Sequence, residues 1–406
     1  MKIGIYGGTF DPPHLGHMEA ARAAAAVLEL DQICFVPAFL PPHKSLPAGA
    51  VSAEDRMAMT ALMADGLCLE TGRPDLARAD GLELERGGKS YTVETLEEYR
   101  RRYPKDELWL LMGTDMFLTL QSWREPEKIM SLAGIAAFAR RETDADGTLE
   151  AQGKFLRQTF GAKVAIIQLP RIIDLSSTQV RELLRRDRPA VRSRLWGQVY
   201  GYILYHGLYG VEVDLKHLPD EDLRCVSLSM VKAKRIPHIL GCEGEAVRLA
   251  KRWGADPELA RRAAILHDCT KYLELDEQLK LCEKYGIVLD SLEQKAVKLL
   301  HSKTGAAIAR YVFGEPEQVC NAIFWHTTGK ADMELLAKVL YLADYIEPSR
   351  AGFPGLDELR RLAYEDLDAA LLLGCELTIA DMEERGMPIH TNTLQARDYL
   401  KGRTHG

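Results

Sequence analysis

Hydrophobic and polar positions divide the chain into two parts. In the first half, five short apolar runs bounded by turn residues predict β-strands at residues 2–6, 32–39, 108–113, 134–139 and 163–170. The segments between them, such as residues 18–30, have helical composition. Strands that alternate with helices are typical of a doubly wound parallel sheet, so the first half is predicted to be an α/β domain.

The second half has no strand pattern after Gly210, and its hydrophobic positions follow helical spacing. In the segment "GADPELARRAAILHD", Asp256 is a candidate helix cap, Pro257 a candidate first helical residue, and an apolar stripe follows them. We therefore predict an α/β domain at residues 1–210, a linker at 211–222 and an all-α domain at 223–406.

Composition limits the classes of protein that fit. With 406 residues and 47% hydrophobic residues, the chain can form two or three globular domains. It has no apolar run long enough for a bilayer and no leader-like segment at its start, so we expect a cytoplasmic protein without a membrane partner. Its eight cysteines form no CxxC pair, and reduced, mostly buried thiols are expected.

Charge argues against nucleic acid as a partner. Residues 1–210 contain 26 basic and 27 acidic side chains, and residues 211–406 contain 26 and 32. The one basic run, residues 181–194, is interpreted mainly as a solvated helix face. The sequence is compatible with a homo-oligomer but does not predict one.

Candidate chemistry begins directly after the first predicted strand, in "GIYGGTFDPPHLGH" (residues 4–17). Ligands of open α/β sheets bind beyond the carboxyl ends of the strands, where glycines let the backbone approach a phosphate. His14 and His17 lie three residues apart, on one side of a helix if the helix begins there. Taken alone, the two histidines could instead be simple helix caps.

Five segments together resemble the HxGH nucleotidyltransferase superfamily, and within it the nicotinate-nucleotide adenylyltransferases. They are "GGTFDPPHLGH", "PAFLPPHK" (37–44), "SYTVETL" (90–96), "MGTDMFLTLQSW" (112–123) and "LSSTQVR" (175–181), in the order of the family. The resemblance implies a Rossmann-like fold. It also implies AMP transfer from magnesium-bound ATP to nicotinate mononucleotide, with nicotinic acid adenine dinucleotide and pyrophosphate as products.

The resemblance also assigns residues. ATP would be bound by Gly7, Gly8, Thr9, Phe10, His14, His17, Gly113, Asp115, Ser177, Thr178 and Arg181, and nicotinate mononucleotide by Lys44, Thr92 and Trp123. His14, His17, Lys44 and Arg181 would be catalytic, because in-line transfer without a covalent intermediate depends on positioning and charge neutralisation. Without the motifs, Lys44 would be an ordinary loop lysine and Trp123 a core residue.

Trp123 also bears on the alternative that the first half adenylylates another phosphorylated acceptor. Phosphopantetheine is disfavoured because its thiol end offers a stacking indole no partner. The residues alone do not decide whether the acceptor is nicotinate mononucleotide or nicotinamide mononucleotide.

Histidines and aspartates stand out in the second half because they follow apolar residues on or at the ends of predicted helices. They are His238, His267, Asp268, His301, His326 and Asp344. Buried donors of this kind are costly unless paired or coordinated, and a set of nitrogen and oxygen donors suits borderline metals. Adjacent residues on a helix point about 100° apart, so His267 and Asp268 favour a pair of metals over one.

The segments "LHDCTK", "LLHSKTGA", "HTTGK" and "ADYIEPSR" resemble the HD phosphohydrolase superfamily, and more narrowly its YqeK group of symmetrical diadenosine tetraphosphate hydrolases. The resemblance implies that the six residues hold two metals, iron or alternatively manganese or cobalt, with Asp268 as the bridge. Asp268 and Lys271 would be catalytic, and Lys271, Thr328, Gly329 and Arg350 would bind the polyphosphate. A water activated by the metals would give two ADP.

We therefore expect a bifunctional fusion of a nicotinate-nucleotide adenylyltransferase with a metal-dependent hydrolase of diadenosine tetraphosphate. A non-catalytic nucleotide sensor and a different nucleotide phosphohydrolase remain the alternatives for the second half.

Overall fold

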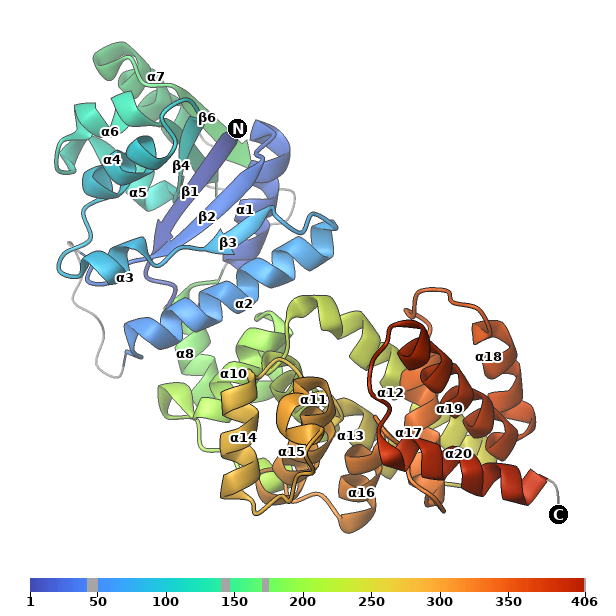
Figure 1. Ribbon diagram of the computed structural model, residues 1–406. Coiled ribbons are helices and arrows are strands. Elements are labelled where there is room, and N and C mark those ends of the chain that lie inside the picture. The colour runs from blue at the N-terminus through green and yellow to red at the C-terminus, as the bar shows by residue number, and fades with distance from the viewer. Residues whose placement is uncertain (42–49, 140–146, 170–174, 405–406) are drawn as a thin grey trace. The chain divides into compact units, whose positions relative to one another are not determined.

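The computed structural model describes residues 1–41, 50–139, 147–169 and 175–404 (Figure 1). The chain divides into two compact units, Met1–Glu212 and Val213–Gly406. Within the described ranges, no helix combines the length and apolarity that crossing a bilayer would require. All eight cysteines are free thiols and only Cys225 is not buried, which confirms the expectation.

A doubly wound parallel sheet forms the centre of the first unit, as predicted, and it has six strands. Its strands are β1 (Lys2–Gly8), β2 (Gln32–Pro37), β3 (Ala77–Ala79), β4 (Glu107–Gly113), β5 (Gly134–Ala139) and β6 (Val164–Gln168). The order β3-β2-β1-β4-β5-β6 is doubly wound, with the direction of winding reversed between β1 and β4. Only β3 escaped prediction, because three residues of sequence "ARA" have neither the length nor the apolarity of a strand signal.

Helices cover both faces of this sheet, with α1 and α2 on one side and α4 to α7 on the other (Figure 1). The helices of the unit are α1 (Leu15–Leu28), α2 (Ala53–Thr71), α3 (Leu82–Arg86), α4 (Thr92–Arg102), α5 (Thr114–Leu118), α6 (Pro126–Leu132), α7 (Thr148–Phe160), α8 (Ser177–Arg186), α9 (Arg188–Arg192) and α10 (Gly197–His206). The core on the α4–α7 side is formed by alternate strand residues such as Ile3, Ile5 and Leu110, with Leu96 and Leu156 from the helices. Burial of both faces explains why the strands read as nearly continuous apolar runs.

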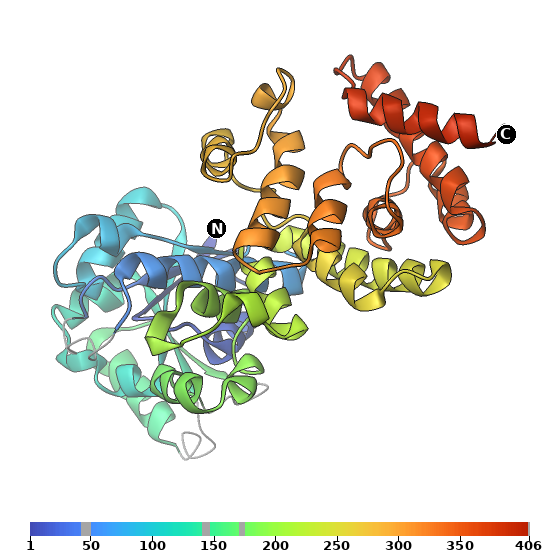
Figure 2. The ribbon, with the colours of Figure 1, turned by 90° about the horizontal axis from the view of Figure 1, so that it is seen from below.

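The second unit is all-helical, as predicted (Figures 1 and 2). Its helices are α11 (Asp220–Ser229), α12 (Ile236–Trp253), α13 (Pro257–Leu266), α14 (Leu275–Lys284), α15 (Val297–Tyr311), α16 (Glu317–Trp325), α17 (Leu335–Ile346), α18 (Leu356–Glu365), α19 (Leu367–Glu384) and α20 (Thr391–Thr404). Asp256 caps α13 by accepting from the amides of Glu258 and Leu259, and Pro257 opens the helix, as the sequence indicates. Since α11 begins at Asp220, the last three residues of the expected linker are helical.

Candidate functional site

A cavity of about 550 Å³ opens at the carboxyl ends of β1 and β4, where the winding of the sheet reverses. Such a switch point is the usual ligand site of doubly wound sheets. Every residue assigned to ATP or the mononucleotide lines it, apart from Lys44: Gly7, Gly8, Thr9, Phe10, His14, His17, Thr92, Gly113, Asp115, Trp123, Ser177, Thr178 and Arg181. Lys44 lies outside the described residues.

A buried arginine holds the turn after β1. Arg56 of α2 is 1% exposed and donates to the carbonyls of Thr9 at 2.8 Å, Ala38 at 2.7 Å and Phe39 at 3.2 Å. Phe10 has a φ of 49°, which side-chain-bearing residues rarely adopt. Arg56 is not among the residues predicted from the sequence, since a single arginine in a helix carries no signal of what it will contact.

His14 and His17 both cap α1 and line the cavity. The amide of Gly16 donates to Nδ1 of His14, and the amide of His14 donates to Nδ1 of His17, each at 3.2 Å. Their rings are 3.8 Å apart. Because both Nδ1 atoms accept, the neutral rings carry their proton on Nε2, which is the tautomer that can donate to a phosphate oxygen. The capping and the ligand interpretations are thus compatible.

The amino terminus of α8 forms a second wall. Its cap Ser176 and Gln179 make a capping box, and the Ser177 hydroxyl donates to the Pro12 carbonyl at 3.0 Å. Arg181 donates to the Asp11 carbonyl at 2.6 Å and to the Thr178 hydroxyl at 3.1 Å. The positive end of α8 and Arg181 therefore face the same cavity, an arrangement that favours an anion.

Asp11 is a second residue that the sequence analysis missed, although it lies inside the quoted motif. It is 2% exposed and its Oδ1 accepts from the Tyr209 hydroxyl at 2.8 Å. Its Oδ2 lies 3.7 Å from Arg181. Asp11 thus links the turn after β1 to α8 and to the end of the unit.

The cavity is also lined by Thr92, Trp123, Arg124 and Glu83. Thr92 is the first residue of α4, and the cap residue Tyr91 makes no side-chain hydrogen bond to the helix. Burial raises the pKa of Glu83, whose carboxylate accepts from the Thr95 hydroxyl at 2.5 Å. Arg124 and Glu83 were not singled out from the sequence.

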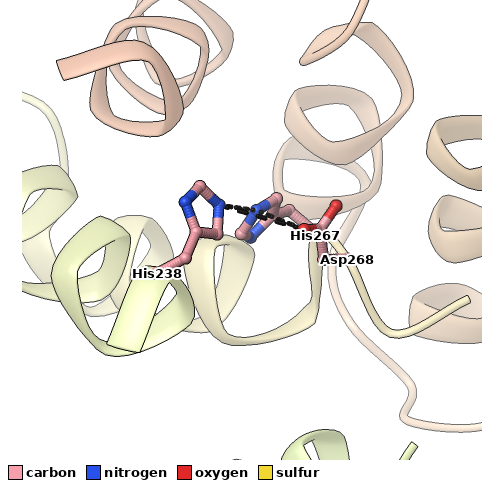
Figure 3. A group of neighbouring side chains, drawn as sticks. All are labelled: His238, His267 and Asp268. Carbon is pink, nitrogen blue, oxygen red and sulfur yellow. Dashed lines mark hydrogen bonds and ion pairs between the residues drawn. The ribbon is translucent and has the colours of Figure 1, made fainter. Parts of the chain in front are cut away.

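In the second unit, all six predicted donors converge. His238 lies in α12, His267 and His326 cap the ends of α13 and α16, Asp268 follows His267, His301 lies in α15 and Asp344 in α17. Figure 3 shows His238 pointing from α12 toward His267 and Asp268. Three groups of these residues each have ligand atoms within 4.8 Å of one another.

The two oxygens of Asp268 face different histidines. Oδ2 lies 3.5 Å from Nε2 of His267 and 3.9 Å from Nε2 of His238. Oδ1 lies 3.3 Å from Nε2 of His301 and 3.9 Å from Nε2 of His326. Asp344 joins the first set, with Oδ1 3.0 Å from Nε2 of His238. One carboxylate therefore stands between two sets of donors.

Backbone carbonyls orient three of the imidazoles. Nδ1 of His267, His301 and His326 lies 2.7 Å from the carbonyl three residues earlier in each case, at Ala264, Lys298 and Ile323. A carbonyl can only accept, so each Nδ1 carries the proton and each Nε2 presents a lone pair to the cluster. Burial, with His301 and His267 nearby, lowers the pKa of His326 well below its ordinary value.

His238 is oriented by a carboxylate that the sequence analysis did not single out. Oε1 of Glu347 lies 3.0 Å from Nδ1 of His238. Glu347 is 1% exposed and accepts from the amide and the hydroxyl of Ser349. A carboxylate behind a histidine is a common support for metal ligands. The signal was present in "ADYIEPSR", but only the fold shows which histidine Glu347 meets.

Cations surround the acidic side of the cluster. Arg235 lies 2.5 Å from Oδ2 of Asp268 and Lys271 lies 3.0 Å from its Oδ1, while Arg350 is 3.3 Å from Oδ1 of Asp344. Burial opposes ionisation of Asp268, but His267, His301 and Lys271 hold its pKa well below the usual range. Arg235 was not predicted.

Thr328 and Gly329, which the resemblance assigns to polyphosphate binding, make local contacts within the second unit. Thr328 is buried and donates to the Gly329 carbonyl, and a Cβ on Gly329 would meet Ala396 of α20 at 3.5 Å. The neighbouring Thr327 reaches the cluster instead, with its hydroxyl 3.4 Å from Nε2 of His301 and 3.3 Å from Nε2 of His326.

A further group, Asp290, Glu293 and His390, also has ligand atoms close together. It differs from the cluster of six donors in the tautomer of its histidine. Nδ1 of His390 accepts from the amide of Asn392, which places the proton on Nε2. Nε2 then faces the two carboxylates at 3.2 and 3.3 Å, and Lys303 pairs with Glu293 at 2.6 Å. We interpret this group as an ion-paired support for the start of α20.

Comparison with known proteins assigns each half. A cytidylyltransferase-like family model matches residues 5–183, and an HD domain model matches residues 235–349. A "Probable nicotinate-nucleotide adenylyltransferase" of Syntrophotalea carbinolica is 36% identical over 222 residues, which are 52% of this chain and 97% of that protein.

The second half matches a "Bis(5'-nucleosyl)-tetraphosphatase, symmetrical" of Bacillus subtilis, 35% identical over 182 residues, which are 45% of this chain and 96% of that protein. A solved HD superfamily hydrolase from Clostridium acetobutylicum is 40% identical and covers 46% of this chain and 98% of its own, with a TM-score of 0.44. The chain therefore belongs to the cytidylyltransferase-like family in its first half, akin to nicotinate-nucleotide adenylyltransferases, and to the HD domain family in its second, akin to symmetrical bis(5'-nucleosyl)-tetraphosphatases.

Proposed function

We propose that the chain is a bifunctional enzyme. Residues 1–210 transfer AMP from magnesium-bound ATP to nicotinate mononucleotide, and residues 223–406 hydrolyse diadenosine tetraphosphate symmetrically to two ADP. The observation that supports the first activity best is that one cavity gathers all its assigned residues that the structure describes. For the second it is the position of Asp268 between two sets of histidines.

In the first reaction a phosphate oxygen of the mononucleotide attacks the α-phosphorus of ATP, and pyrophosphate leaves. His14 and His17 donate from Nε2 to the triphosphate, while Arg181 and the first turn of α8 neutralise charge on the departing pyrophosphate. Arg56 keeps the Thr9 carbonyl in place, so that the turn after β1 is organised before substrate binds.

The acceptor occupies the other end of the cavity. Trp123 stacks on the pyridine ring, and the uncapped first turn of α4 at Thr92 offers amides to a substituent on that ring. Lys44, which the structure does not describe, holds the acceptor's phosphate in this proposal. Phosphopantetheine is the competing acceptor.

The donor set of the second unit fits a pair of transition-metal ions, because it combines histidine Nε2 lone pairs with carboxylate oxygens and no thiolate. His238, His267 and Asp344 would hold one ion, His301 and His326 the other, and Asp268 both. Bound there, such ions supply a hydroxide-like nucleophile near neutral pH. We propose iron, with manganese or cobalt as substitutes. Arg235, Lys271 and Arg350 neutralise the polyphosphate.

Two assays on one preparation of the full chain test the proposal. His17→Ala should abolish formation of nicotinic acid adenine dinucleotide and spare hydrolysis of diadenosine tetraphosphate, and Asp268→Ala should do the reverse. His217→Ala and Asp381→Ala, both at exposed positions outside the two sites, serve as matched controls. Loss of both activities in either site variant, with the controls active, would contradict two independent sites.

Metal dependence separates an enzyme from a sensor. A chelator should remove hydrolysis, and iron, manganese or cobalt should restore it, while elemental analysis should find about two ions per chain. Binding of diadenosine tetraphosphate without turnover in the metal-replete protein would instead support the sensor, and turnover of other nucleotides alone would support a different phosphohydrolase.

A further inference from the structure

Two buried side chains connect the turn after β1 to the end of the first unit. Asp11 and Tyr209 are 2% and 3% exposed, and the Tyr209 hydroxyl donates to Oδ1 of Asp11 at 2.8 Å across 198 positions of sequence. Asp11 lines the cavity at the carboxyl ends of β1 and β4, whereas Tyr209 is not among the described residues that line it. Tyr209 therefore acts on this cavity through the residues that it contacts.

The backbone of Tyr209 is fixed as well. It lies in a short helical turn, Leu208–Gly210, with a φ of 61° and a ψ of 21°, the left-handed region that is costly for a residue with a side chain. Its carbonyl accepts from Nε of Arg185 at 3.1 Å, and Arg185 lies one turn beyond Arg181 in α8. A strained, buried conformation of this kind persists because the surrounding structure determines the place of the residue.

Arg181 lies beside the Asp11 carboxylate without a hydrogen bond to it. Nη1 of Arg181 donates to the Asp11 backbone carbonyl at 2.6 Å, but it lies 3.7 Å from Oδ2, beyond hydrogen-bond distance. Oδ2 is buried and accepts no hydrogen bond from any described residue. A buried carboxylate oxygen next to a guanidinium normally bonds to it, so other contacts must hold the Asp11 side chain in this orientation.

The Tyr209 hydroxyl supplies that restraint. A carboxyl group can turn about its Cβ–Cγ bond, and the hydrogen bond to Oδ1 opposes this rotation. Burial and the Asp11 charge raise the pKa of Tyr209 well above its ordinary value, so the phenol keeps its proton and remains a donor. Nη1 and Nη2 of Arg56, the other cation near Asp11, already donate to backbone carbonyls. Without the Tyr209 hydroxyl, the carboxylate would therefore turn to Arg181.

We propose that Tyr209 is a positioning residue for AMP transfer: its hydroxyl keeps the Asp11 carboxylate from forming a hydrogen-bonded ion pair with Arg181, so that the guanidinium keeps its donors for the departing pyrophosphate. The proposal rests on the proposed adenylyltransferase activity and adds to it a residue behind the cavity wall. An Arg181 that is bonded to a carboxylate has fewer donors and less uncompensated charge to offer a phosphate oxygen.

Inhibition of AMP transfer by pyrophosphate, measured on the full chain, tests this role, because an inhibition constant does not depend on the fraction of active protein. Tyr209→Phe should raise the inhibition constant for pyrophosphate about tenfold and lower kcat by a similar factor, since a hydrogen bond from a charged group is lost. The KM for nicotinate mononucleotide should change by less than about twofold. A merely structural role would reduce the folded fraction, as measured by thermal unfolding, and leave the inhibition constant unchanged.

Asp11→Asn tests the competing charge directly. Because a carboxamide brings no negative charge to Arg181, the Asp11→Asn, Tyr209→Phe double variant should bring the inhibition constant back to within about threefold of the parent value. Asp11→Asn alone should not raise it. A tenfold rise in Asp11→Asn would overturn the proposal, because it would show that the carboxylate charge itself, and not its restraint, keeps Arg181 in place.

Tyr202→Phe is the matched control. The Tyr202 hydroxyl also donates to an aspartate of this unit, Asp55 at 3.0 Å, but neither residue is among the described residues that line the cavity. Its inhibition constant for pyrophosphate should equal that of the parent.

Failure of this role and failure of the proposed function give different results. A parent chain that transfers no AMP to nicotinate mononucleotide would refute the proposed function and the role of Tyr209 with it. With an active parent, an unchanged inhibition constant in Tyr209→Phe, or an equal rise in Tyr209→Phe and in the double variant, would refute the role of Tyr209 and leave the proposed function intact.

Discussion

Five histidines of the two candidate sites bond a ring nitrogen to the backbone, and the direction of that bond decides what each can do. In His14 and His17, Nδ1 accepts from an amide, so Nε2 carries a proton and donates, which suits a phosphate. In His267, His301 and His326, Nδ1 donates to a carbonyl, so Nε2 has a lone pair, which suits a metal. One residue type thus supports two chemistries through local hydrogen bonding.

The same reasoning gives Glu347 a testable role at the metal cluster. Glu347→Gln should weaken metal binding by about 10- to 100-fold, because the carboxylate that orients His238 through Nδ1 becomes a neutral amide. A competition titration with a chromophoric chelator on the full chain measures this. Glu358→Gln, at an exposed glutamate paired with Arg361, should bind metal like the parent. If a folded Glu347→Gln variant bound metal as tightly as the parent, Glu347 would have no role in metal binding.

The raised pKa of Glu83 predicts a pH dependence of stability. Its folded pKa lies above its unfolded value near 4.3, so between the two values the folded state binds more protons. The free energy of unfolding therefore falls as the pH rises through that window. In Glu83→Gln, the amide oxygen can still accept from the Thr95 hydroxyl. The free energy of unfolding of this variant should not fall in the same window, because the amide does not titrate.

Thermal unfolding across a pH series compares the two proteins. The stability of Glu83→Gln relative to the parent should rise through the window and stay constant above it. A pH-independent difference would show that Glu83 titrates normally.

At the scale of elements, helix ends carry most of the functional groups. His267 and His326 stand at the carboxyl ends of α13 and α16, and His14 at the amino end of α1. Helix ends have unpaired backbone groups, which gives a polar side chain both a bonding partner and a fixed direction. This is why short motifs such as "LHD" could be placed from the sequence, since the caps that bound the helices are themselves local.

The cap of α13 is one such local feature. Asp256→Ala should lower the free energy of unfolding by about 1 kcal/mol, because the amides of Glu258 and Leu259 lose their acceptor. Asp256→Asn should keep most of the stability, since an amide oxygen also caps. Denaturant unfolding followed by circular dichroism compares the three proteins. An alanine variant as stable as the parent would mean that water replaces the cap without cost.

At the scale of the whole molecule, each unit has its own core and its own candidate site. The proposed chemistries share adenine nucleotides, and this suggests a link. If the γ-phosphate of one ATP replaces the mononucleotide as nucleophile at the α-phosphorus of another, diadenosine tetraphosphate forms and pyrophosphate leaves. The second unit would then remove a side product of the first.

If the two units are linked in this way, diadenosine tetraphosphate should accumulate when the second activity is removed. Incubated with magnesium and ATP alone, Asp268→Ala should accumulate diadenosine tetraphosphate above the parent level, as measured by chromatography. The His17→Ala, Asp268→Ala double variant should not, because it lacks the source. Equal levels in Asp268→Ala and the parent would remove the support for a link between the two units.

The local sequence pattern was sufficient to predict the two fold classes, the five longer strands and the six clustered donors of the second unit. It was insufficient for β3, whose three residues pair only because β2 offers an edge, and for Arg56, Glu347 and Arg235. These three residues act on groups that are distant in the sequence, at Thr9, His238 and Asp268.

What the sequence by itself determined was therefore whatever depends on neighbours along the chain: strand and helix periodicity, helix caps, and the motifs that place glycines and histidines at element ends. What only the tertiary structure decided was which far-separated groups meet. It placed Asp268 between two pairs of histidines and Arg56 against the turn after β1. The physical reason is that helical and strand periods arise from local backbone geometry, whereas contacts between elements depend on how their buried faces pack.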